Sequence, residues 1–317
     1  MRCRLRAMSH RGLSFLTGVR LLKMVHQRRS LIAPRNQRSA PFSLHSVIID
    51  TSLYAIMRPR RNTMADTMQR FKTLFAGSDV DYVECEVVNA TQRYLQLREQ
   101  GRHEGFTPVI VTLDDLILDE ITEGLENAGV QTVPELVRRT MEASQAIDVP
   151  AFFAHAAQEL PAETAKKDQQ ISTVDDYFAS GFSASPDDDD PTTVDFISPF
   201  QADSDNPVII IKLPTTAPYE ALAYLCMGGW NDCPEPAIQV AVSRYWYEKY
   251  GAVPAAISHD TVEYYVECPP QTDADAKAVA VELFYFSYGD AVYQGSETFE
   301  ALANQVYSSR QWYVWWD

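Results

Sequence analysis

The sequence has no apolar run long enough to cross a membrane. Its longest apolar stretches, such as the segment at 207–211, have only the length of a β-strand, whereas a spanning helix needs about 20 apolar residues. Cysteine is also scarce: the five cysteines are odd in number, widely spaced and without a Cys-x-x-Cys pair. These absences argue against a membrane protein, a disulfide framework and a zinc site, and they favour a cytoplasmic location.

The sequence also lacks the short motifs that carry common chemistries. It contains no glycine-rich phosphate loop, no HExxH and no GxSxG. The absence makes an enzyme less expected without excluding one, because many active sites leave no linear signature. Whether the protein is an enzyme therefore stays open, and no cofactor is indicated.

Basic residues are scarce after residue 63. Residues 1–63 carry thirteen Lys and Arg and a single acid, whereas 64–206 carry nine bases and twenty-eight acids. Residues 207–317 carry five bases and fourteen acids, and the chain as a whole has a net charge of −16. An acidic body repels phosphate backbones, which argues against nucleic-acid binding by residues 64–317.

The basic segment 1–63 allows three interpretations. The favoured one is that it is not part of the working protein, because Met57 and Met64 offer later starts directly before the acidic, patterned sequence. The alternatives are a disordered basic tail and an organellar targeting presequence, for which an Arg-rich and acid-poor composition is typical.

Residues 64–165 show the pattern of an α/β region. Residues 80–87 alternate and are rich in β-formers, 92–100 predict a helix, and 105–113 predict a second strand. This is a β-α-β unit, most simply with parallel strands. Further helices are predicted near 113–127, 134–146 and 150–160.

An acidic segment follows at 166–206, which we predict to be a mobile linker. It has nine aspartates and no Lys or Arg between 172 and 206, so burial cannot offset the entropy of ordering it. The run Asp187–Asp190 is read as a solvated loop in preference to a weak cation site. Four aromatic residues are candidates for local docking on the body: Phe178, Phe182, Phe196 and Phe200.

Residues 207–317 predict an αβ domain that ends in a buried strand. A strand at 207–213 is followed by helices at 218–229 and 233–250, and two further strands flank a two-residue turn at His259-Asp260. Helices at 273–287 and 297–307 precede the last strand, whose two faces are both apolar, so we expect cover on both sides. The expected class is α+β, with a mixed sheet covered by helices.

Several segments of this last region carry a family resemblance. "GGWNDCPEP", "RYWYEKYGA", "SHDTVEYYVECPP", "AVELFYFSYGD" and "WYVWWD" resemble a bacterial family catalogued as domain of unknown function 4253, over about 207–317. "RYLQLREQGRHEGFTPVIV" resembles that family's N-terminal portion more weakly. Where family members commonly show "CPD" before the last helix, this chain has "SYGD", so only Asp290 carries over. The resemblance implies a soluble α+β domain and supplies no established activity.

The first candidate site is the polar cluster Trp230, Asn231 and Asp232. A tryptophan platform beside an amide and a carboxylate is suited to a small ligand, and Trp315 is a further ligand-binding candidate. Alternatively, Asp232 and Glu235 form a capping box at a helix start, which is the favoured reading and leaves Trp230 and Asn231 unexplained.

The second candidate cluster is His259, Asp260 and Glu263. Imidazole beside carboxylates can act as a general acid or base near neutral pH, although tight-turn chemistry and a solvated face are the favoured explanation.

Two further possibilities concern a metal ion and a thiol. Asp232, Asp260 and Asp317 are candidate metal ligands with hard oxygen donors. The favoured alternative is that Asp317 is simply exposed at the end of the chain. Cys233 lies near a helix start, where a thiol pKa is lowered. A packed cysteine is favoured instead.

The leading hypothesis is an acidic protein that binds a basic protein partner or a small ligand, in an immunity-like or regulatory role. The alternative is a metal-assisted hydrolase that uses Asp232, Asp260, Glu263 and His259. A second alternative is a structural interaction module whose aromatic residues all belong to the core.

Overall fold

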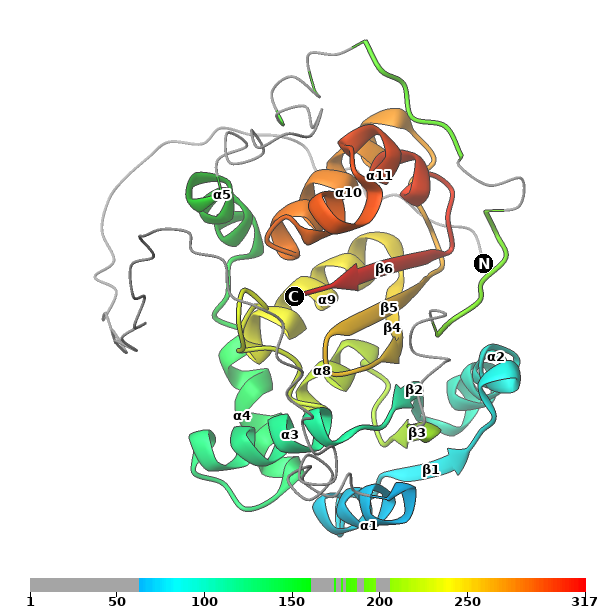
Figure 1. The fold of residues 1–317 in the computed structure, drawn as a ribbon, viewed down its shortest axis with the longest axis vertical. Helices are drawn as coiled ribbons and strands as arrows, with labels where there is room; N and C mark the ends of the chain where they lie inside the picture. The colour runs from blue at the N-terminus through cyan, green and yellow to red at the C-terminus, as the bar shows by residue number, and fades with distance from the viewer. Residues whose placement is uncertain (1–62, 161–173, 175–177, 179–180, 187–190, 198–205) are drawn as a thin grey trace, which may run out of the picture. The chain divides into compact units, whose positions relative to one another are not determined.

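Six strands, which come from the regions 64–165 and 207–317, pair into one mixed sheet (Figure 1). The computed structural model describes residues 63–160, 174, 178, 181–186, 191–197 and 206–317. Among the described strands, whose order is β1-β3-β2-β4-β5-β6, the only parallel neighbours are β2 and β4. The strands are β1 (Asp81–Glu84), β2 (Thr107–Thr112), β3 (Val208–Leu213), β4 (Ala252–Ile257), β5 (Thr261–Val266) and β6 (Gln311–Trp315). The predicted α+β class with a mixed sheet is confirmed.

Helices pack on both faces of this sheet, although not over every strand. They are α1 (Met64–Leu74), α2 (Val87–Glu104), α3 (Asp115–Ala128), α4 (Val133–Ser144), α5 (Val149–Glu159), the short turns η2 (Pro218–Glu220) and α8 (Ala221–Tyr224), α9 (Pro236–Tyr250), α10 (Asp273–Phe286), the π-helical turn η3 (Ala291–Ser296) and α11 (Phe299–Val306). None of the helices in the described ranges combines the length and the apolar character that a bilayer crossing requires.

Alternation along the strands divides the buried side chains between two cores. In β2, Val109 and Val111 belong to the larger core, whereas Ile110 belongs to the smaller core on the opposite face. Helix α2 closes the smaller core with Tyr94 and Leu97, and the other helices pack around the larger core. Because both faces are covered, β2 and β3 read as continuous apolar runs.

The predicted β-α-β unit exists, with one difference in its pairing. β1 and β2 run parallel, as expected from the connecting helix α2, but they are not neighbours. β3 lies between them and is antiparallel to both. A strand that follows more than ninety residues after β2 therefore completes the N-terminal unit, and the two predicted regions share one sheet within one compact unit.

Part of the predicted linker is built into this unit. Phe196 is buried against Tyr94, with ring centroids 5.3 Å apart, and Ile197 is buried beside it in the smaller core. The expectation of a mobile linker is therefore wrong for residues 191–197. Phe182 packs partly against the larger core, whereas Phe178 is exposed.

Three sequence predictions fall on residues that the structure does not describe. Phe200, the run Asp187–Asp190 and all but the last residue of the basic segment 1–63 lie outside the described ranges. Nothing in the structure bears on them.

The C-terminal strand β6 is the edge strand next to β5. Its side chains at Trp312 and Val314, and Trp316 directly after it, are fully buried in the larger core. The opposite face is not covered, because Tyr313 is 43% exposed and Trp315 is half-buried. The expectation of cover on both faces was therefore wrong: one face belongs to the core and the other lines cavities.

Candidate functional site

The parallel pairing of β2 and β4 brings two distant polar segments together. Parallel strands end at the same edge of a sheet, so Asp114, which follows β2, meets His259, which follows β4. His259 Nδ1 lies 2.7 Å from Asp114 Oδ2, while Asp114 Oδ1 accepts a hydrogen bond from the backbone N–H of Ile117 and caps α3. Asp114 therefore fixes both a helix start and an imidazole ring.

A second carboxylate, Asp260, lies on the other side of the imidazole. Its Oδ1 accepts hydrogen bonds from the hydroxyls of Ser258 and Thr261, and its Oδ2 accepts one from the indole N–H of Trp315 at 3.2 Å. His259 Nε2 is 3.5 Å from the same Oδ2. The hydrogen bond to Asp114, aided by the nearby charge of Asp260, raises the pKa of His259 above its usual value despite partial burial.

A tight loop between α8 and α9 places Trp230 beside this turn. Gly228 has a φ of +102°, and a Cβ there would meet the carbonyl oxygen of Pro234 at 2.0 Å, so only glycine fits. The backbone N–H of Cys233 donates to the carbonyl of Trp230 at 2.9 Å, with Asn231 in the left-handed region at a φ of 43°. This turn explains Asn231, whose amide side chain tolerates such angles.

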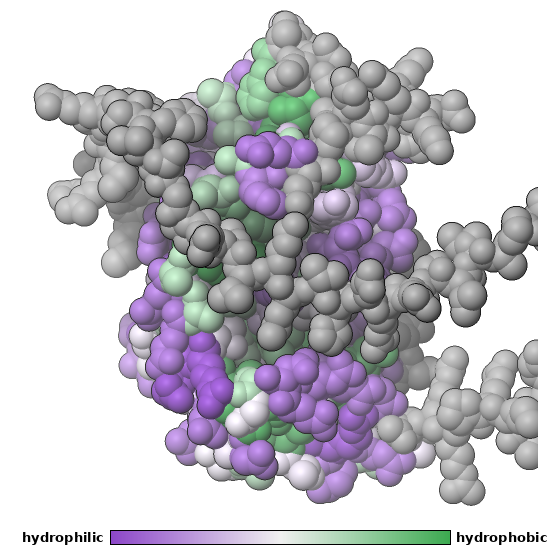
Figure 2. Space-filling view, turned by 90° about the vertical axis from the view of Figure 1, so that its left-hand side faces the viewer, coloured by the Kyte–Doolittle hydropathy of each residue, from purple (hydrophilic) through white to green (hydrophobic). Residues whose placement is uncertain are grey.

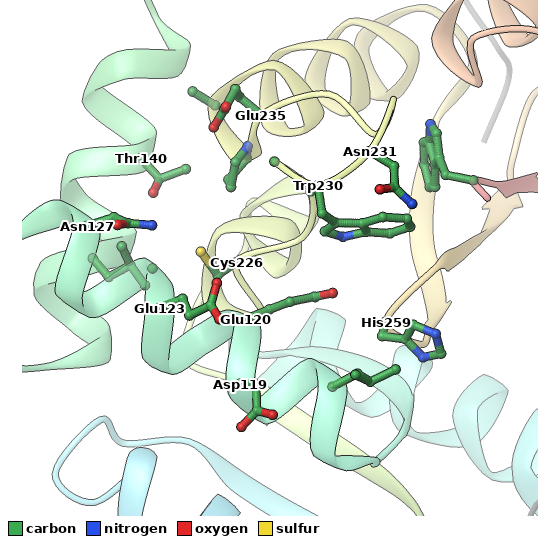
Figure 3. A pocket seen from close by; sticks show the side chains of 18 of the residues that line it. Asp119, Glu120, Glu123, Asn127, Thr140, Cys226, Trp230, Asn231, Glu235 and His259 are labelled. Atoms are coloured by element: carbon green, nitrogen blue, oxygen red, sulfur yellow. The ribbon is translucent and has the colours of Figure 1, made fainter. Parts of the chain in front are cut away.

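Trp230 forms a wall of a cavity of about 840 Å³ between α3, α4, the loop and the C-terminus (Figure 3). The cavity is predominantly acidic and aromatic. Its ionisable and aromatic lining residues are Asp119, Glu120, Glu123, Arg139, Trp230, Glu235, His259, Asp260, Trp315, Trp316 and Asp317. Six carboxylates therefore face one guanidinium and one imidazole. Figure 2 shows hydrophilic residues gathered over the lower part of the face that carries α3 and α4, with apolar groups between them.

Two buried polar atoms in this cavity have no hydrogen-bond partner among the described residues: Glu120 Oε2 and the indole Nε1 of Trp230. In Figure 3, the Glu120 side chain extends from α3 beneath the Trp230 ring. Leaving such a group unsatisfied costs about 1–3 kcal/mol. Burial raises the pKa of Glu120 to about 8, only partly opposed by the charge of His259. Glu120 is therefore predominantly protonated at neutral pH.

One comparison with known protein families matches the C-terminal part of the chain. Residues 209–317 match the family model of a domain of unknown function, DUF4253. No curated protein matches the chain. No solved structure matches it either.

The DUF4253 segment supplies only part of the cavity. It contributes the Trp230 loop, the His259-Asp260 turn and the terminal tryptophans, whereas Glu120, Glu123 and Arg139 come from helices outside the matched segment. The cavity therefore depends on the preceding α/β region as well as on the DUF4253 segment.

The structure brings together some of the predicted site residues. His259 and Asp260 are adjacent and share the cavity with Trp230, Asn231 and Trp315. The end of the chain also reaches it: Asp317 lines the cavity, and its backbone N–H donates to Asp290 Oδ2 at 3.1 Å.

Two residues of the proposed hydrolase do not join this cluster. Asp232 is exposed and does not line the cavity. Glu263 is buried, and its carboxylate accepts hydrogen bonds from the backbone N–H of Ile197 at 2.8 Å and from Gln311 Nε2 at 2.7 Å. The prediction of a solvated face at Glu263 is therefore wrong. This carboxylate joins residues 191–197 to β5 and β6.

The predicted capping box at the start of α9 is also wrong. The helix begins at Pro236, three residues later than expected, and its N-cap is Glu235 without a side-chain hydrogen bond. Proline is favoured at the first helical position because its missing N–H needs no partner there. Asp232 lies in the preceding turn, outside the helix start.

The other predicted chemistries find no support among the described residues. None of their His, Cys, Asp and Glu side chains form a group of three or more that could hold a metal ion, so Asp232, Asp260 and Asp317 do not converge. Cys233 is buried, receives a hydrogen bond from Gln239 Nε2 at 3.2 Å, and has a pKa raised by burial. It is a packed thiol.

Sequence reasoning missed Asp114 and Glu120. Asp114 carried one signal, since an aspartate directly before an amphipathic helix is typical of an N-cap. Glu120 carried none that separates it from other helix-surface glutamates, because its burial depends on packing against the DUF4253 segment.

A second cavity of about 810 Å³ adjoins the first, sharing His259, Asp260 and Trp315 with it. It is also lined by Asp290 and by residues of η3 and α11. The His259-Asp260 turn and Trp315 thus form a common wall between two cavities.

Proposed function

We propose that this protein is a binding module for an organic cation, and that the cavity at Trp230 receives the ligand's ammonium or guanidinium group. The observation that carries the proposal is the lining: six carboxylates and three indoles against two basic side chains. Carboxylates attract a cation by charge, and an indole face attracts it through the ring quadrupole.

The state of the individual carboxylates supports the same proposal. Asp119 is occupied by an ion pair with Arg70 at 2.5 Å, and Asp260 accepts hydrogen bonds from Trp315 and two hydroxyls. The side-chain carboxylates of Glu123 and Glu235 make no hydrogen bond to another described residue, and both residues are exposed and line the cavity. These two are therefore the side chains best placed to attract an incoming cation.

A cation of this kind has two sources, a free small molecule and a basic side chain of a protein partner. The second source corresponds to the expected basic partner of an immunity-like or regulatory protein. The proposed setting is the cytoplasm, as inferred above from the sparse cysteines. The hydrolase alternative has less support, because Asp232 lies outside the cavity and Glu263 is occupied by structural hydrogen bonds.

Neutralising the two accessible glutamates is expected to weaken cation binding. Butylguanidine, measured by calorimetry at low ionic strength, should bind the Glu123→Gln/Glu235→Gln variant about three- to tenfold more weakly than the original protein, since an exposed charge pair contributes about 0.2–1 kcal/mol. The affinity of the original protein should also fall as salt is added, because ions screen exposed charges.

The matched control removes two exposed glutamates near the opposite edge of the sheet. Glu84 ends β1 and Glu86 precedes α2, so Glu84→Gln/Glu86→Gln makes the same change in net charge far along the strand order from β6. It should leave the affinity unchanged. Equal effects of both pairs, or no binding of butylguanidine by the original protein, would refute the proposed site. Repeating the titration with a peptide that carries one arginine between glycines distinguishes a protein partner from a free cation.

A further inference from the structure

The cavity at Trp230 holds two polar groups that need opposite hydrogen-bond partners. The indole N–H of Trp230 can only donate a hydrogen bond, whereas the Glu120 carboxylate, once ionised, only accepts. Both atoms are buried and lack a partner among the described residues. Of the buried side-chain atoms that lack a hydrogen-bond partner among the described residues, these two are the ones that line this cavity, so a ligand there can make their hydrogen bonds.

The two groups extend into the cavity from different parts of the chain. Glu120 comes from α3, whereas Trp230 is held by the glycine turn that precedes α9. Figure 3 shows the carboxyl end of Glu120 beneath the Trp230 ring. One ligand can therefore satisfy both groups only if it carries both a donor and an acceptor.

We propose that the ligand carries a cationic N–H group and, a few bonds away, an oxygen acceptor, as an arginine or lysine residue with its own carbonyl does. The cation donates to the Glu120 carboxylate, and the oxygen accepts from the Trp230 indole. Glu120 releases its proton to solvent when the cation binds. This inference rests on the proposed function and specifies the ligand class for the same cavity.

The proton release follows from the surroundings of Glu120. The charged groups that act on it are Asp114 at the N-cap of α3, Glu123 on α3, and His259 and Asp260 in the β4–β5 turn. The thiols of Cys226 and Cys233 and the carboxylate of Glu235 also face this part of the molecule. Burial is the main cause that raises the pKa of Glu120 to about 8, His259 opposes it, and the neighbouring carboxylates add to it, so the carboxyl is mostly protonated at neutral pH. A bound cation reverses this balance by favouring the ionised form.

Three probes separate the two recognition elements. Butylguanidine carries the cation alone, N-acetyl-norleucinamide carries the acceptors alone, and N-acetyl-argininamide carries both. In calorimetry near neutral pH, N-acetyl-argininamide should bind about tenfold more tightly than butylguanidine, and N-acetyl-norleucinamide should not bind measurably. Titrations in buffers of different ionisation enthalpy should show close to one proton released per cation bound.

Two conservative variants assign these effects to residues. Trp230→Phe keeps the ring but removes the N–H, so it should abolish the preference for N-acetyl-argininamide while butylguanidine still binds. Glu120→Gln keeps the shape but cannot ionise, so it should abolish proton release and weaken both cations. Circular dichroism spectra and unfolding curves check that both variants remain folded.

The possible results distinguish this inference from the proposed function. Equal affinities for the two guanidinium probes, an unchanged preference in Trp230→Phe, or proton release that persists in Glu120→Gln would overturn the ligand class while leaving cation binding intact. Failure of every cationic probe to bind the original protein would instead refute the proposed function itself. An arginine between glycines that binds as tightly as N-acetyl-argininamide indicates a peptide source.

Discussion

Removal of residues 311–317 is expected to abolish cooperative unfolding of the protein. The deletion takes away β6 and with it three fully buried side chains, Trp312, Val314 and Trp316. Trp312 makes edge-to-face contacts with Trp246 and Tyr250, and Trp316 donates its indole N–H to the carbonyl of Phe286 at 3.0 Å. The combined loss is on the order of 10 kcal/mol, which is comparable with the whole stability of a typical domain.

Single substitutions within β6 make this prediction sharper. Trp312→Ala should lower the free energy of unfolding by about 3–5 kcal/mol in denaturant titrations, as expected for a large buried aromatic side chain. Tyr313→Ala is the matched control, because Tyr313 follows Trp312 in the same strand and is 43% exposed. This substitution should lower the free energy of unfolding by less than about 1 kcal/mol. Equal effects of the two changes, or a truncated chain that still unfolds cooperatively, would show that β6 is not part of the core.

Glu120→Gln is expected to stabilise the protein at alkaline pH but not at acidic pH. Burial raises the pKa of Glu120 to about 8 in the folded protein, whereas an unfolded glutamate titrates near about 4.3. Between these values the folded protein binds more protons than the unfolded chain, so its free energy of unfolding falls as pH rises. The full shift corresponds to about 5 kcal/mol, and because the side chain is only partly buried we expect on the order of 2–3 kcal/mol.

The measurement is denaturant unfolding of the variant and the original protein between about pH 5 and about pH 9. Glu123→Gln is the control, since it removes an exposed carboxylate one turn further along α3. His259 acts in the same direction: because its pKa is raised in the folded protein, the stability it contributes is lost as pH rises through that pKa. His259→Gln separates the two contributions. Parallel pH profiles for Glu120→Gln and the original protein would contradict the burial of an unsatisfied carboxyl.

Local patterns in the sequence predicted much of the C-terminal half. The two-residue turn at His259-Asp260 was expected from the spacing of two β-rich runs, and the structure has this hairpin between β4 and β5. The continuous apolar run of the last residues predicted a strand with its tryptophans in the core, which is confirmed for Trp312 and Trp316. The pattern did not predict that this strand lies at the sheet edge, where Trp315 lines a cavity.

The site itself depends on contacts that a local pattern does not encode. Asp114 and His259 are 145 positions apart and meet because β2 and β4 pair in parallel. Glu263 has the alternation of an exposed position, yet residues 191–197 cover it and donate a hydrogen bond to it. Asp232 matched a local capping signature, but Pro236 sets the start of α9. In each case long-range packing or backbone chemistry outweighed the local signal.

The central claim is that the cavity around Trp230 binds an organic cation, and indole NMR tests it most directly. With ¹⁵N-labelled tryptophan, each of the five indoles gives one N–H signal, assigned by single Trp→Phe variants. On titration with N-acetyl-argininamide, the signals of Trp230 and Trp315 should shift, because both side chains line the cavity. The signal of Trp246, which is buried and donates to Glu282 at 2.8 Å, should stay in place. Unchanged signals from Trp230 and Trp315 at saturating probe would contradict the claim.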